Sequence, residues 1–115
     1  MIIGTLGYMS PEQAEGRDVD PRADIFVLGI VLHFCLTGKS PYGAGTAAAI
    51  LYRTVHQRID VTNLPVSQEF REVIARATAL QVDERFPDAA EFKKALESTP
   101  EWYSSDQEVQ SPQRL

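Results

Sequence analysis

Cysteine and histidine are scarce in this chain of 115 residues, which contains one cysteine, Cys35, and two histidines, His33 and His56. A single cysteine excludes a disulfide within the chain, and no metal-ligand spacing surrounds it. We expect Cys35 to be a buried, unreactive thiol in a reducing compartment, which favours a cytoplasmic location. Neither histidine has companion ligands or an obvious nucleophile nearby, so we expect both to be structural and predict no metal site.

The chain also lacks an excess of positive charge and a long hydrophobic run. Its net charge of -5 argues against nonspecific binding to nucleic acid or to an anionic membrane, because both attract basic surfaces. The longest apolar stretch, residues 25–36, is interrupted by Gly29 and His33. It is shorter than the roughly 20 residues of a membrane span. The first residues, Met1 to Thr5, have no basic start typical of a secretory signal.

Signals for helices dominate the sequence, and signals for strands are almost absent. Ser10-Pro11-Glu12-Gln13 is a capping-box pattern with proline at the first helical position, and Gly16 is expected to end that short helix. Further helices are predicted from Asp20-Pro21 to about Thr37, and after Thr46, Ser67 and Asp88. We therefore predict a mainly α domain over residues 1–97, with about five helices and no sheet, followed by a polar, flexible tail over residues 98–115.

The predicted helix that ends near Thr37 is apolar around its whole circumference between Ile25 and Leu36. A helix of this kind is normally buried on all sides at the centre of a domain. Because few residues of this short chain remain to surround it, we expect an exposed apolar patch along Ile25 to Leu36.

Four motifs occur in a familiar order: Ser10-Pro11-Glu12-Gln13, Asp24-Ile25-Phe26-Val27-Leu28-Gly29, Leu36-Thr37-Gly38 with Pro41-Tyr42, and Asp83-Glu84-Arg85-Phe86. Together with Gly4-Thr5-Leu6-Gly7-Tyr8 they resemble the helical C-terminal lobe of bacterial, eukaryotic-like serine/threonine protein kinases, from the end of the activation segment onward. The resemblance covers residues 4 to about 97. One departure is Val27, where the family usually has serine.

The resemblance implies roles for particular residues. Thr5, Leu6, Gly7 and Tyr8 would line the pocket for the substrate residue, with Thr5 also hydrogen-bonded to the catalytic aspartate. From composition alone, the favoured interpretation of Thr5 is a turn threonine that bonds to nearby backbone, and the surrounding motif reverses that preference.

Three charged residues complete the implied set. Glu12 and Arg85 would form a buried ion pair that holds the activation segment on the helical lobe, although without the motifs they would be two unrelated surface charges. Asp24 would anchor the catalytic loop, and on local grounds it is an acid favoured in the first turn of a helix.

The sequence contains no glycine-rich phosphate loop preceded by a strand, no His-Arg-Asp loop and no Asp-Phe-Gly motif. We therefore expect no complete catalytic set and no ATP or Mg²⁺ site in this chain, although the intact family uses both. The favoured interpretation is a fragment of a serine/threonine kinase. One alternative is a non-catalytic module that docks a protein. The other is one half of a kinase domain, whose missing N-lobe is supplied by a separate chain. A protein substrate or docking partner is expected in each case.

Overall fold

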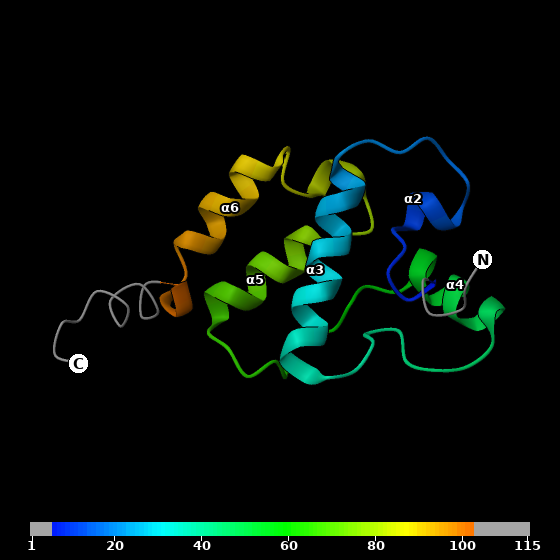
Figure 1. The fold of residues 1–115 in the computed structure, drawn as a ribbon, viewed down its shortest axis with the longest axis horizontal. Helices are drawn as coiled ribbons and strands as arrows, with labels where there is room; N and C mark the ends of the chain where they lie inside the picture. The colour runs from blue at the N-terminus through cyan, green and yellow to red at the C-terminus, as the bar shows by residue number, and fades with distance from the viewer. Residues whose placement is uncertain (1–5, 103–115) are drawn as a thin grey trace, which may run out of the picture.

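The computed structural model describes residues 6–102, and these form a helical array with no strand among them. The elements are α2 (Pro11–Ala14), α3 (Arg22–Thr37), α4 (Ala47–His56), α5 (Gln68–Ala77), a 3₁₀ turn η1 (Val82–Glu84) and α6 (Ala89–Glu97). Helix α3 runs through the middle, with α5 and α6 on one side and α2 and α4 on the other (Figure 1). The predicted mainly α fold with a central apolar helix is confirmed.

The predicted helix starts are set by side-chain caps. Ser10, Thr46, Ser67 and Asp88 each accept a hydrogen bond from a backbone N–H in the first turn of the helix that follows. At α3 the backbone N–H of Arg22 donates to Oδ1 of Asp20 at 2.8 Å, and the helix begins at Arg22. Gly38 ends α3 with a φ of 72°, the left-handed conformation predicted for it.

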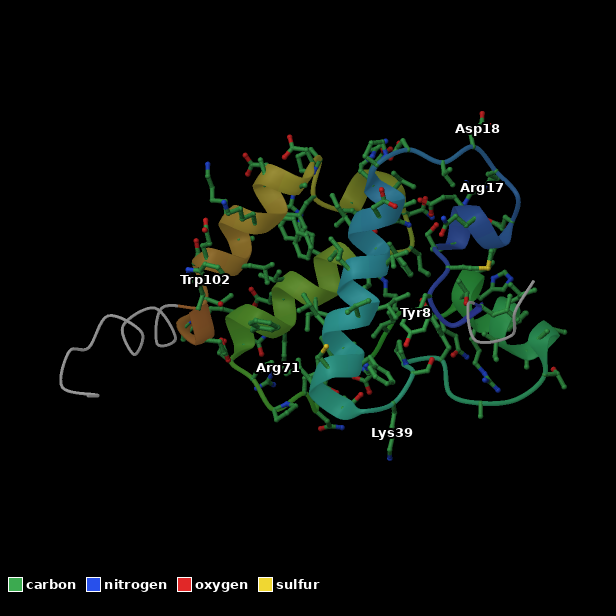
Figure 2. The ribbon with its side chains drawn as sticks, in the orientation of Figure 1. Tyr8, Arg17, Asp18, Lys39, Arg71 and Trp102 are labelled. Atoms are coloured by element: carbon green, nitrogen blue, oxygen red, sulfur yellow. The ribbon has the colours of Figure 1, made fainter. Side chains whose placement is uncertain are left out.

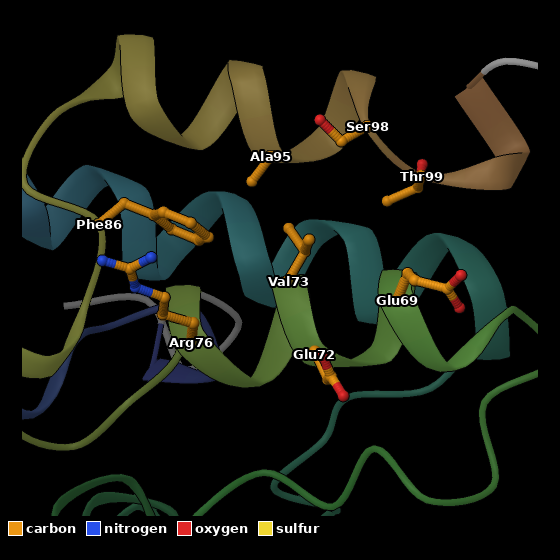
Figure 3. A pocket seen from close by; sticks show the side chains of 8 residues that line it. All are labelled: Glu69, Glu72, Val73, Arg76, Phe86, Ala95, Ser98 and Thr99. Carbon is orange, nitrogen blue, oxygen red and sulfur yellow. The ribbon is translucent and has the colours of Figure 1, made fainter.

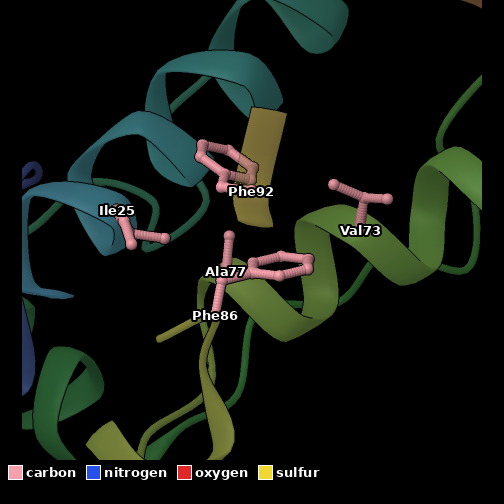
Figure 4. Close-up of a cluster of buried hydrophobic side chains, with 5 residues drawn as sticks. All are labelled: Ile25, Val73, Ala77, Phe86 and Phe92. Carbon is pink, nitrogen blue, oxygen red and sulfur yellow. The ribbon is translucent and has the colours of Figure 1, made fainter. Parts of the chain in front are cut away.

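One hydrophobic cluster joins α3, α5 and α6 (Figure 4). It consists of Ile25, Val73, Ala77, Phe86 and Phe92. The close approach of α3 to the end of α5 depends on Gly29, because a Cβ atom there would lie 2.5 Å from Cγ2 of Thr78. Any larger residue at position 29 would push the two helices apart.

A second cluster packs the other side of α3 against the segments that flank α4. It contains Phe26, Ile30, Tyr42 and Ile59. The Tyr42 hydroxyl and Nδ1 of His33 are buried and have no hydrogen-bond partner within residues 6–102. Burial raises the pKa of Tyr42, and burial lowers the pKa of His33 against the opposing effect of Asp60, so both groups are uncharged near neutral pH.

One face of α3 is open to solvent. Leu28, Val31 and Phe34 are 48%, 39% and 41% exposed, and Cys35 is exposed beside them. Positions 28, 31 and 35 share one side of a helix because they are three and four residues apart. The expected exposed patch is therefore present, here called the open α3 face. The prediction that Cys35 is buried was wrong, because Cys35 lies on this face.

Packing continues beyond residue 97, where composition predicts a flexible tail. Thr99 is 1% exposed and donates from its hydroxyl to the Leu96 carbonyl. The Glu101 carboxylate accepts hydrogen bonds from the backbone N–H and the hydroxyl of Ser67, at 2.6 and 2.8 Å. Trp102 is half-exposed at the end of the described chain (Figure 2). The two bonds of Glu101 therefore connect the segment after α6 to the start of α5.

Candidate functional site

The segment before α2 carries the predicted substrate-pocket residues. Leu6 is buried, Gly7 and Tyr8 are partly exposed, and Tyr8 packs against the second cluster. Gly7 lies close to Ser40, because a Cβ on Gly7 would be 3.2 Å from the Ser40 hydroxyl oxygen. Thr5 lies outside the described residues, so its role stays a prediction. The structure thus places Leu6, Gly7 and Tyr8 beside the turn that follows α3.

A reciprocal cap orients the short helix α2. The backbone N–H of Ser10 donates to the Gln13 side-chain oxygen at 2.9 Å, and the backbone N–H of Gln13 donates to the Ser10 hydroxyl. Pro11 occupies the first helical position, where a missing N–H costs nothing. This arrangement fixes the direction of the helix and turns Glu12 inward, where it is 2% exposed.

Glu12 and Arg85 form a buried, bidentate ion pair across 73 residues of sequence. Nη1 and Nη2 of Arg85 donate to the two carboxylate oxygens at 2.7 and 2.8 Å. The two side chains are 3% and 0% exposed. A planar guanidinium suits this geometry because its parallel N–H groups match both oxygens at once.

Every N–H group of the Arg85 guanidinium has a partner. Besides the two bonds to Glu12, Nε donates to the Ala79 carbonyl at 2.8 Å, and the remaining two donate to the carbonyls of Arg22 and Leu80. A guanidinium has five N–H donors, and five are used here. Arg85 therefore ties α2, the first residue of α3 and the α5–η1 connection together at one point.

The aromatic ring of Phe26 completes the surroundings of this pair, with the Arg85 guanidinium carbon 4.8 Å from the ring centroid. Burial acts to raise the pKa of Glu12, but the hydrogen bonds and the charge of Arg85 outweigh it, so the pKa is lowered. The Glu12 carboxylate is accordingly charged at neutral pH. The sequence motifs pointed to the pair, whereas the three carbonyl contacts have no residue signature because any residue supplies a carbonyl.

Asp24 lies at the N-terminal end of the open α3 face. It lies in the first turn of α3, is exposed, and makes no side-chain hydrogen bond within the described part of the chain. Asp24, Leu28 and Val31 follow one another at spacings of four and three residues, so they share one side of the helix. The face therefore combines a carboxylate at one end with apolar side chains along its length.

Comparison with known proteins identifies the family. The family model described as protein kinase domain matches residues 1–102. The chain belongs to the protein kinase family. The predicted resemblance to bacterial serine/threonine kinases is confirmed by relatives that carry that name. This kinase-family chain is 38% identical over 100 residues to the serine/threonine-protein kinase PknB of Mycolicibacterium smegmatis, which covers 83% of the chain and 16% of the relative.

Two further relatives have similar names. The serine/threonine-protein kinase PksC of Streptomyces coelicolor is 38% identical over 92 residues, covering 77% of this chain and 16% of the relative. The serine/threonine-protein kinase PknL of Mycobacterium tuberculosis is 34% identical over 109 residues, covering 88% of this chain and 26% of the relative. The kinase-family chain thus spans between 16% and 26% of the length of these curated relatives.

The described part of this kinase-family chain offers side chains that can hold a neighbouring segment in place. No group of three or more His, Cys, Asp or Glu side chains within residues 6–102 is arranged to hold a metal ion. None of the described helices has the length and apolar character needed to cross a membrane. The arrangement can hold a segment in place through the Glu12–Arg85 pair, and it presents a carboxylate and an apolar face to a neighbour.

Proposed function

We propose that this chain is the helical, substrate-side part of a serine/threonine kinase domain, and that it takes part in ATP-dependent protein phosphorylation only together with an ATP-binding part. The proposal draws on the family and on the names of the relatives. The observation that carries it is the open α3 face. A central helix with an exposed apolar side, headed by an exposed carboxylate, is suited to being covered by another part of the same domain.

The energetic reason is the cost of leaving that face in water. Burying an apolar side chain of this size contributes roughly 1.5–3 kcal/mol, and Leu28, Val31 and Phe34 are each between 39% and 48% exposed. Covering all three would therefore supply a few kcal/mol. We propose that the catalytic loop of the kinase domain covers this face and that its backbone N–H groups donate to the carboxylate of Asp24.

The other residues would act by positioning. Glu12 and Arg85 would hold the end of the activation segment on the helical part, and Leu6, Gly7 and Tyr8, with Thr5, would line the pocket beside the acceptor hydroxyl. The nucleotide and Mg²⁺ would be held by the ATP-binding part, which supplies the charge neutralisation that phosphoryl transfer requires. The substrates would be serine and threonine residues of proteins, and the location would be cytoplasmic.

A chimera tests this proposal. The kinase-domain region of the Mycolicibacterium smegmatis relative that precedes the match would be joined in frame to residue 1 of this chain. We expect the chimera, and not the chain alone, to transfer phosphate from ATP-Mg²⁺ to a serine/threonine peptide. Asp24→Asn should lower the rate, whereas the exposed Asp18→Asn should not. A folded chimera without activity would contradict the proposal.

The second candidate is a non-catalytic module that docks a protein through the substrate-side surface, residues 5–9 and α4. The observation in its favour is that the described helices pack around two clusters with their predicted caps formed. The two candidates differ in the behaviour of the open α3 face in the isolated chain. The kinase-part proposal expects the isolated chain to bind a hydrophobic dye, and Leu28→Lys with Phe34→Ser to reduce that binding. A soluble monomer without dye binding would favour the docking module.

A further inference from the structure

A groove of about 310 Å³ lies between α5 and α6, on a part of the surface distinct from the open α3 face (Figure 3). Its apolar residues are Val73 on α5, Phe86 after η1, and Ala95 on α6. Val73 and Phe86 belong to the first hydrophobic cluster, so the floor of the groove is the outer edge of the core. Ser98 and Thr99 border it at the end of α6. The groove therefore offers a rigid apolar floor to a ligand.

Three charged side chains of α5 line this groove: Glu69 lies toward one end, Arg76 toward the other, and Glu72 between them (Figure 3). All three are exposed, and none of them forms an ion pair with another residue between 6 and 102. The Arg76 guanidinium lies over the Phe86 ring, with its central carbon 4.3 Å from the ring centroid. That contact fixes a positive charge at one end of the apolar floor, with the negative charge of Glu69 at the other end and that of Glu72 between them.

We propose that this groove binds a short segment of a partner protein in which an aliphatic residue stands between a basic residue and an acidic residue. The aliphatic side chain would lie on Val73, Phe86 and Ala95. The basic residue would pair with Glu69 and Glu72, and the acidic residue with Arg76.

The spacing of the charges sets the length of the partner segment. Glu69 and Arg76 are seven positions apart on α5, which corresponds to about 10 Å along a helix. An extended peptide covers that distance in about three residues, at roughly 3.3 Å each. The basic and acidic residues of the segment would thus be about three positions apart. This inference goes beyond the proposed kinase function and does not depend on it, because none of these residues belongs to the candidate site.

The test is a binding titration with the full chain and a fluorescent peptide, Gly-Arg-Leu-Leu-Asp-Gly, followed by anisotropy. We expect the double variant E69Q/E72Q to bind about tenfold more weakly, which corresponds to two exposed charge contacts of typical strength. The matched control is E15Q/E97Q, which removes the same charge from exposed glutamates that do not line the groove. It should bind the peptide as tightly as the unaltered chain does. Added salt should reduce the difference in peptide affinity between E69Q/E72Q and E15Q/E97Q, because salt screens exposed charges.

A second variant tests the proposal by blocking the groove with a large side chain. Ser98 is exposed at its border, so Ser98→Trp should fill the groove without disturbing the core, and circular dichroism would verify the helix content. We expect it to abolish binding, as should a peptide with serine in place of both leucines. No binding up to about 1 mM protein, or equal binding by the unaltered chain, E69Q/E72Q and Ser98→Trp, would overturn the proposal. A dimer of the chain that Ser98→Trp converts to monomer would also overturn it, since the occupant would be a second copy.

Discussion

Replacing Arg85 by methionine should destabilise this chain more than any surface substitution. The variant keeps a long apolar side chain over Phe26 but removes all five hydrogen bonds of the guanidinium. It leaves the Glu12 carboxylate, whose side chain is 3% exposed, buried without a counter-charge. Breaking a buried pair in this way costs about 3–5 kcal/mol. Because a domain of this size is stable by roughly 5–15 kcal/mol, about a fifth or more of its stability would be lost.

Urea unfolding followed by circular dichroism at neutral pH measures this loss. Arg58→Met is the matched control, because Arg58 pairs with Glu84 at 3.3 Å on the surface, with side chains 69% and 53% exposed. An exposed pair of this kind contributes at most about 1 kcal/mol. We expect Arg85→Met to lower the unfolding free energy at least three times as much as Arg58→Met does.

A double-mutant cycle isolates the pair itself. In Glu12→Gln combined with Arg85→Met no buried charge remains, so the double variant should lose about 1–3 kcal/mol less than the sum of the two single variants. The reasoning is refuted if the losses are additive, or if Arg85→Met costs no more than Arg58→Met.

The pH dependence of stability gives an independent check on the same pair. The folded-state pKa of Glu12 lies below its ordinary value of 4.5, so its contribution is present above that pH. The contribution is lost as the pH falls through the lowered pKa. Glu12→Gln should therefore flatten the acid limb of the stability curve, and an unchanged limb would contradict the lowered pKa.

Three further predictions concern the rest of the fold. Gly29→Ala should lower the unfolding free energy in urea by about 1–3 kcal/mol, because its Cβ would lie 2.5 Å from Cγ2 of Thr78; a neutral result would mean that the helices separate easily. The lowered pKa of His33 means that the folded state binds fewer protons than the unfolded state near the ordinary pKa of 6.5, so the urea concentration at the unfolding midpoint should decrease as the pH is lowered through 6.5. His33→Gln should remove that part of the slope, and an unchanged slope would rule His33 out as its source. Ser67→Ala removes both a helix cap and the partner of Glu101, and should cost about 1–2 kcal/mol by the same assay, more than Glu101→Gln alone; equal costs would show that the cap is unimportant.

The sequence by itself determined the helices and the family of this protein. Ser10, Asp88 and Gly38 act on backbone groups within four residues of themselves, so their effect on helix ends does not depend on the rest of the molecule. The kinase motifs predicted an ion pair between Glu12 and Arg85, although no local feature of either residue indicates the other as its partner.

Only the tertiary structure decided which sides of the helices are covered. An apolar pattern around the whole of α3 cannot show which face lacks a neighbour, and the exposure of Leu28, Val31 and Cys35 follows from where α5 and the α4 region pack. The contact of Glu101 with Ser67 and the charged groove beside Arg76 likewise join residues far apart in the chain. Such contacts depend on the position of whole helices, which no short stretch of sequence encodes.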